Sequence, residues 1–422
     1  MDASEPILIY AELLSNIRQV SVGCSLRTPV SSSTRASVSS DGRVLTINHD
    51  GVETSVRLPG QVALSNRLPV PNLGTTSLSW RLPLAPTSGQ HASSTQEGQA
   101  VPWSASDLQP ESPIMCRTCR ATIVEPGTIK EWKDLPSENW AEMMEFWHCH
   151  KPHEHGRGPN DSLTTSKAYG ASSRISAQSG IGFVDLTSFL LSEKDVSSSN
   201  VSTLEVIKSI SSLQSHKDAD FHDETLKGEA HHSPAENLPL LCRSCESQVG
   251  VVNDQGTSFS LFKWQVHVNE LSHRTSNGPP ELSQCISAML LATMARSGCS
   301  KSIILPLKGQ DQPAQEVSQA NGTIKTLLNI WVFNSSIIFS STKAMRSPVR
   351  AVKVFYRMVT QAEADNLLDS MTSDVQDIYL PADAIQKVID TLSRSNLVLP
   401  LNDRQFKEWK VGLLEKWAEN GG

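Results

Sequence analysis

Two short stretches decide the fold of the middle of this chain, PIMCRTCR at 113–120 and LPLLCRSCESQVG at 238–250. Both contain the motif C-R-[TS]-C, and the four cysteines are Cys116, Cys119, Cys242 and Cys245. Two residues between cysteines let both thiolates of a turn reach a metal ion about 2.3 Å away, and two such turns complete a tetrahedron. We therefore predict that the four cysteines hold a structural zinc ion (Zn2+) in a zinc-ribbon-like β module.

Two other interpretations of the cysteine pairs stay open. A redox dithiol is one, because C-x-x-C also occurs in thioredoxin-like turns. Unligated thiols are the other. The two pairs match each other and no convincing βαβ unit surrounds them, which favours zinc. The long segment between the pairs is rich in serine, so we interpret it as an excursion between two equivalent metal-binding turns.

The bulk composition limits the classes of protein to consider. A length of 422 residues suggests two or three domains. The net charge is −7 and no dense run of Lys and Arg occurs, which disfavours a protein that binds nucleic acid through phosphates. We find neither an apolar window that could span a membrane nor a signal pattern at the acidic N-terminus. We expect a cytoplasmic and nuclear protein whose eight cysteines are not paired in disulfides.

Strand-like alternation and changes of composition suggest three segments in a mainly β, α+β fold. Residues 1–110 read as an antiparallel β domain, with the clearest pair of strands at 42–58. Residues 113–270 would form the zinc-binding module, which also carries a helix. A Ser-rich insertion at about 156–237 interrupts this module, and we expect it to be disordered apart from a strand-like island. Residues 275–422 read as a mixed α/β region.

Within the last segment the periodicity predicts individual elements. Apolar residues at helical spacing predict helices at 281–298 and 385–392, and a final amphipathic helix at 406–417. The Asn-Ser step inside 327–341 predicts a hairpin. The apolar run at 351–359 predicts a further strand.

A histidine-rich stretch, ENWAEMMEFWHCHKPHEH at 138–155, carries one cysteine, Cys149. The Trp and Met residues before it fall at helical spacing, which predicts a helix at 137–148. Neighbouring imidazolium groups lower the pKa of a thiol, whereas the negative end of a helix dipole raises it. Three interpretations of Cys149 therefore stay open, namely a nucleophile, an additional metal ligand and an inert buried thiol.

Taken together, these motifs resemble the family of HECT-like ubiquitin ligases, which are also described as ubiquitin-conjugating-enzyme-binding proteins. Most of the chain from about residue 113 onward carries the resemblance, and the N-terminal strands fit it only loosely. The segments that carry it are CRTC at 116–119, LPSENWAEMMEFWHCH at 135–150, IGFVDLTSFLL at 181–191, CRSC at 242–245, AVKVFYR at 351–357 and LSRSNLVLP at 392–400.

The resemblance implies ubiquitin transfer. A ubiquitin-conjugating enzyme would pass ubiquitin to the chain as a cysteine thioester, which a substrate lysine then attacks. Cys149 would bear the thioester, with His150 as its electrostatic or proton-transfer neighbour. The family is also associated with cyclin B and with messenger-RNA 3′-end processing, which supplies expected protein partners. The chain departs from true HECT ligases, whose catalytic cysteine lies near the C-terminus, because no cysteine follows Cys299.

Two other functions remain under consideration. The first is a non-catalytic, zinc-stabilised adaptor or chaperone that holds one client, such as a messenger-RNA 3′-end-processing subunit. The second is direct binding of RNA through a zinc ribbon. The sequence favours this least, because it lacks the basic surface that phosphate contacts need.

Overall fold

The computed structural model of the chain describes residues 7–63, 67–70, 74–86, 101–135, 176–203, 237–253, 257–268, 278–307, 326–343, 347–370 and 374–417. The chain divides into two compact units. The first unit comprises residues 1–102, 280–307 and 311–422, and the second comprises 103–279 and 308–310. The expected mainly β, α+β architecture is confirmed. The three expected segments stay a prediction, but stretches from both ends of the chain share the first unit.

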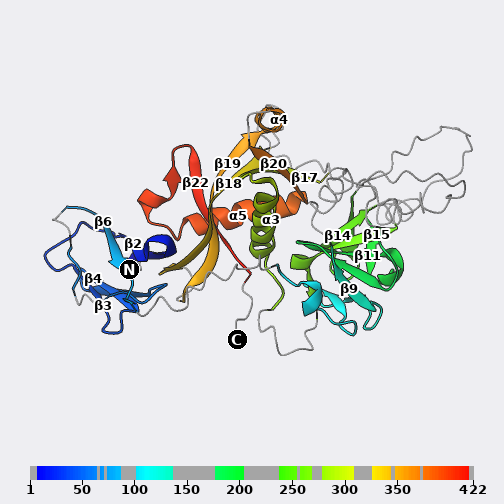
Figure 1. The fold of residues 1–422 in the computed structure, drawn as a ribbon, viewed down its shortest axis with the longest axis horizontal. Helices are drawn as coiled ribbons and strands as arrows, with labels where there is room; N and C mark the ends of the chain where they lie inside the picture. Colours follow the sequence, from blue (N-terminus) through cyan, green and yellow to red (C-terminus); the bar gives the residue numbers. More distant parts are fainter. Residues whose placement is uncertain are drawn as a thin grey trace, which may run out of the picture. The chain divides into compact units, whose positions relative to one another are not determined.

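The long strand β18 (Thr326–Ser341) organises the main sheet of the first unit. Strand β19 (Val349–Thr360) pairs with it along one side. Along its other side, β17 (Lys301–Pro306) pairs with its first half and β1 (Leu8–Leu14) pairs with its second half. The N-terminal strands therefore join the same sheet as the C-terminal ones (Figure 1).

The remaining strands extend this sheet and form a smaller one. The sheet runs in the order β21-β22-β19-β18-β1-β2-β6, and β17 also pairs in parallel with β20. These added strands are β2 (Gln19–Ser25), β6 (Ser77–Pro83), β20 (Val375–Leu380), β21 (Gln405–Phe406) and β22 (Trp409–Glu415). The smaller sheet contains β3 (Arg35–Val38), β4 (Val44–His49) and β5 (Val52–Arg57). The alternating apolar residues of β2, β4 and β6 meet in one buried cluster, as their period of two requires.

Two sequence-based predictions for this unit are wrong. The segment 327–341 is one continuous strand rather than a hairpin, because β19 pairs with both of its halves and the Asn-Ser step falls at register shifts near Asn334. The segment 406–417 contains the hairpin β21–β22 instead of a helix. The spacing of its apolar side chains fits the helical period of about 3.6 residues as well as the strand period of two. Pairing with β19 buries Val411 and Leu413 as strand residues.

Helices α3 (Leu282–Ser297) and α5 (Ala382–Asn396) confirm the other two helix predictions, and both pack against β22. The approach of α5 is close, since a Cβ added to Gly412 would lie 2.6 Å from Cδ2 of Leu392. Figure 1 shows both helices beside the sheet of this unit. The short helix α4 (Gln361–Asp369) contacts β18, β19 and β20.

The described residues of the second unit form two sheets and include the cysteine pairs. Its larger sheet has the order β12-β13-β14-β15-β11-β10-β9, and its smaller one has the order β16-β7-β8. The strands are β7 (Ile114–Cys116), β8 (Thr122–Val124), β9 (Glu131–Asp134), β10 (Ile181–Val184), β11 (Ser188–Ser192), β12 (Val201–Thr203), β13 (Leu238–Cys242), β14 (Gln248–Asn253), β15 (Ser258–Phe262) and β16 (Val266–Val268). Strands β10 and β11 coincide with the strand-like island expected at 181–191, whereas β12 lies in a part of the Ser-rich segment expected to be disordered. Residues 156–175 and 204–236 of that segment lie outside the described residues.

Among the helices that the structure describes, none combines the length and the apolar composition that crossing a membrane requires.

Candidate metal centre

The two C-R-[TS]-C motifs fold into the same backbone turn. Cys116 ends β7 and Cys242 ends β13, so each first cysteine comes directly at the end of a strand. Four residues further on, the N–H of Arg120 donates to the Cys116 carbonyl at 3.0 Å, and the N–H of Glu246 donates to the Cys242 carbonyl at 2.8 Å. Arg120 and Glu246 also share a left-handed backbone conformation, with φ of 61° and 58°. The expected equivalence of the two turns is confirmed.

The arginine of each motif fastens its turn to a neighbouring segment. Arg117 donates from Nη1 to the carbonyl of Trp264 at 3.2 Å. Arg243 donates from Nε to the carbonyl of Val201 at 2.7 Å. Sequence reasoning did not assign a role to these arginines. Their repetition in both motifs was the signal that could have revealed them.

The four thiols converge on one point. The Sγ atoms of Cys116 and Cys245 are 3.6 Å apart, and those of Cys119 and Cys242 are 3.5 Å apart. All four Sγ atoms lie within 4.8 Å of one another. A tetrahedral zinc ion with Zn–S bonds of about 2.3 Å separates its sulfurs by about 3.8 Å, so the arrangement fits such an ion. The four cysteines are free thiols, because a disulfide would require about 2 Å.

The contacts between sulfurs also distinguish a metal site from a redox dithiol. Both short contacts join cysteines of different motifs. A tetrahedral site requires the two turns to face each other in this way, whereas a dithiol of the thioredoxin type functions within one motif. The geometry therefore favours metal binding by the whole set of four.

The electrostatic surroundings differ among the four thiols. Burial raises the pKa of Cys116 to about 12 and also raises the pKa of Cys242. A hydrogen bond with the Ser247 hydroxyl lowers the pKa of Cys245 to about 6. Buried thiolates need a neighbouring positive charge, and a divalent cation supplies it when it displaces the thiol protons. Metal binding at this site should therefore weaken as the pH falls.

Cys149, His150 and the predicted helix at 137–148 lie outside the described residues, and their roles stay predictions. Of the other cysteines, Cys24 and Cys285 are buried. Burial raises the pKa of Cys24 to about 12, so its thiol stays protonated and inert at neutral pH.

Comparison with known proteins identifies the family. The sequence model of the family described as HECT-like ubiquitin-conjugating enzyme (E2)-binding matches residues 12–411. This match contains both cysteine motifs and reaches into both units, and the chain belongs to this family.

Relatives resemble the chain at low identity. An uncharacterised protein of Schizosaccharomyces pombe is 24% identical over 321 residues, which cover 75% of this chain and 78% of that protein. Two proteins named as E3 ubiquitin-protein ligases, from Pongo abelii and Homo sapiens, are each 21% identical, over 321 and 325 residues. Each of these two matches covers 71% of this chain and 72% of the relative. No solved structure matches the chain.

Proposed function

We propose that this chain is a ubiquitin ligase-like protein that binds a ubiquitin-conjugating enzyme and accepts ubiquitin as a thioester on Cys149. The match of the family model to residues 12–411 carries this proposal, because the description of the family refers to binding of a conjugating enzyme. The relatives named as E3 ubiquitin-protein ligases support it. The protein substrates would include cyclin B or a messenger-RNA 3′-end-processing factor, in the cytoplasm and the nucleus.

The proposed reaction has two transfers. The Cys149 thiolate attacks the thioester carbonyl at the end of ubiquitin, a new Sγ–C bond forms, and the thiolate of the conjugating enzyme leaves. A substrate lysine amine then attacks the same carbonyl, an isopeptide bond forms, and the Cys149 thiolate leaves. His150 would accept a proton from the attacking group or stabilise the thiolate.

A thioester assay tests the nucleophile. The full chain is incubated with a conjugating enzyme charged with ubiquitin, and adducts are compared with and without reductant. We expect a reductant-sensitive adduct with the wild type that Cys149→Ser abolishes. Cys299→Ser is the matched control, because Cys299 is only half-buried and lies outside the cluster of four thiols. An adduct that survives Cys149→Ser would exclude Cys149 as the acceptor.

The metal in this proposal is one structural zinc ion held by Cys116, Cys119, Cys242 and Cys245. Four thiolates leave no open position on the ion, which is typical of structural rather than catalytic zinc. Elemental analysis of the purified chain should find one zinc per chain. The zinc should be lost in Cys242→Ser and kept in Cys299→Ser, and equal zinc in both variants would contradict the assignment.

A non-catalytic adaptor or chaperone is the second candidate, and the closed four-thiol arrangement favours it because such a site stabilises a fold without taking part in chemistry. This candidate predicts that Cys149→Ser leaves the abundance of the client unchanged, whereas Cys242→Ser lowers it strongly. Client abundance in cells that express each variant separates the two functions. Equal loss of the client in both variants would argue against the adaptor.

A further inference from the structure

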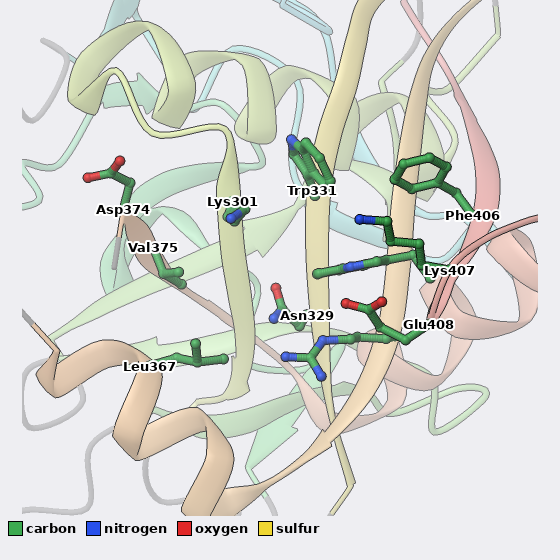
Figure 2. Close-up of a pocket in the computed structure, with 11 residues that line it drawn as sticks. Lys301, Asn329, Trp331, Leu367, Asp374, Val375, Phe406, Lys407 and Glu408 are labelled. Carbon is green, nitrogen blue, oxygen red and sulfur yellow. The ribbon is translucent and has the colours of Figure 1, made fainter. Parts of the chain in front are cut away.

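The main sheet of the first unit has a pocket on the face that α5 does not cover. Tyr356 and Gly412 face α5, and successive strand residues point to opposite faces, so Arg357 points the other way. The pocket on that face has a volume of about 550 Å³ and lies over β17, β18 and β19, next to the turn between β21 and β22. We call it the sheet-face pocket, and Figure 2 shows its lining. The lining residues include Lys301, Asn329, Trp331, Arg357, Phe406 and Lys407. Its volume falls in the range of small-ligand sites, about 300–1,000 Å³.

Two buried polar atoms of the pocket have no hydrogen-bond partner among the described residues, namely Oδ1 of Asn329 and Nε of Arg357. Asn329 is only 2% exposed. The two residues lie directly opposite each other in the pairing of β18 with β19, and Figure 2 shows Asn329 in the middle of the lining side chains. Buried polar atoms are nearly always bonded in native proteins. Here an acceptor and a donor belong to two residues that are paired across the strands, and each lacks a complementary group that a ligand can supply.

The walls of the pocket combine positive charge with aromatic rings. Lys301 Nζ lies 5.4 Å from the Trp331 ring centre, Arg357 Cζ lies 5.1 Å from that of Trp409, and Lys407 Nζ lies 5.7 Å from that of Phe406. The carboxylates that line the pocket are those of Asp374 and Glu408. Three cations against two carboxylates favour a ligand that is neutral or acidic.

An aromatic stack extends from the pocket to the surface. The Phe355 ring lies 4.6 Å from the ring of Phe333 and 5.1 Å from that of Phe406, stacked on both. The two outer rings are 56% and 44% exposed. Exposed aromatic rings beside a polar pocket are typical of surfaces that bind a partner, because they bury large apolar area when they are covered.

We propose that the sheet-face pocket binds an extended peptide segment, neutral or acidic, of another protein. One peptide N–H donates to Oδ1 of Asn329 and the carbonyl of a peptide group accepts from Nε of Arg357. An apolar or aromatic side chain of the segment lies on the exposed ring of Phe406, which lines the pocket. A carboxylate would leave Asn329 without a donor, and an ammonium group would leave Arg357 without an acceptor, whereas a peptide group satisfies both.

This inference goes beyond the proposed ubiquitin transfer, because it depends neither on Cys149 nor on the metal. The edge of a nucleobase also offers a neighbouring donor and acceptor. The net charge of −7 disfavours a nucleic acid, so the peptide is the ligand to which we commit, and the nucleobase becomes an outcome of the test.

Saturation-transfer NMR on the full chain tests the proposal with three probes. N-acetyl-phenylalanyl-glycinamide carries peptide groups and one aromatic side chain, 3-phenylpropionate replaces the peptide groups by a carboxylate, and adenosine monophosphate carries a nucleobase. We expect transfer to the ring protons of the peptide, weaker transfer to phenylpropionate and none to the nucleotide. No transfer to the peptide, or transfer to the nucleotide alone, would overturn the proposal.

Matched variants locate the binding. Phe406→Ala should weaken binding of the peptide, whereas Tyr379→Ala should not, since Tyr379 is exposed to a similar extent, 42%, but does not line the pocket. Asn329→Leu should weaken binding about tenfold, the loss of one hydrogen bond. Its thermal midpoint should be equal to that of the wild type or higher, because the variant removes a polar atom that has no partner in the free protein. Unchanged binding in both Phe406→Ala and Asn329→Leu would overturn the proposal.

Discussion

The two units are both built mainly from antiparallel strands, but different interactions hold their parts together. In the first unit, apolar side chains from strands far apart in the chain close continuous cores, such as the cluster that joins Tyr10, Phe339 and Leu413. In the second unit, two turns separated by more than a hundred residues bring four thiols to one point. A metal ion there would close a long loop, which contributes more to stability as the loop lengthens. The first unit should therefore tolerate metal removal, and the second should not.

Removal of the metal should produce the largest difference between the units. A chelator would leave four thiols without their ion and Cys242→Ser would leave three, and binding of a structural zinc typically contributes about 10–16 kcal/mol in small domains. We expect peptides of the second unit to lose protection in hydrogen exchange, while β18 and β19 keep theirs. Cys299→Ser is the control, and equal loss of protection in both units would break the comparison.

Truncation of Leu392 should have the next largest effect, confined to the first unit. Its side chain is fully buried and packs over Gly412. We expect Leu392→Ala to lower the free energy of unfolding of this unit by about 2–5 kcal/mol, with zinc content unchanged. Denaturant titration measures the loss. Leu397→Ala changes a side chain that is 50% exposed and should lower the free energy of unfolding only slightly. A similar loss in both variants would contradict the packing argument.

A buried ion pair in the first unit should contribute less to the free energy of unfolding than the side chain of Leu392 does. Lys353 Nζ lies 2.7 Å from Glu12 Oε2, and the hydroxyl of Tyr10 donates to the same oxygen at 2.8 Å. Lys353→Met leaves the Glu12 carboxylate buried without its cation, and we expect a loss of about 2 kcal/mol, because the lysine is partly exposed.

The double variant Glu12→Met with Lys353→Met should recover most of that stability, since replacing both charges by apolar groups is often nearly neutral. Thermal unfolding of the single and double variants measures this. A double variant that is less stable than Lys353→Met would contradict the explanation.

The smallest effect should be a pH-dependent one at the end of β22. Burial, and then repulsion by Glu281, raise the pKa of Glu415. An acid whose folded-state pKa is raised contributes stability below its unfolded-state pKa and loses it as the pH rises through the folded-state value. Glu415→Gln should therefore stabilise the first unit relative to the wild type at pH 7 more than at pH 4.5. Thermal midpoints of the variant and the wild type at both pH values test this. A difference between variant and wild type that is the same at both pH values would contradict the prediction.

Local spacing was enough to predict several features. The two C-x-x-C pairs were found because metal geometry imposes a short, fixed spacing within each turn. Helix α5 was found because Ile385, Val388 and Leu392 repeat with the helical period. Two predictions failed: the segment 406–417 became the hairpin β21–β22 through pairing with β19, and the Asn-Ser step in β18 made no turn because β19 pairs with both halves of that strand. Their neighbours, rather than their own periodicity, decided the outcome.

By itself, the sequence determined the mainly β class, the four thiols and the family motifs, because each depends on residue types at short range. Only the tertiary structure showed that the short Sγ–Sγ contacts join cysteines of different motifs, and only it placed Asn329 opposite Arg357. Both results depend on strand register between distant segments. Register is set by the burial of whole strand faces, and no short stretch of sequence carries that information.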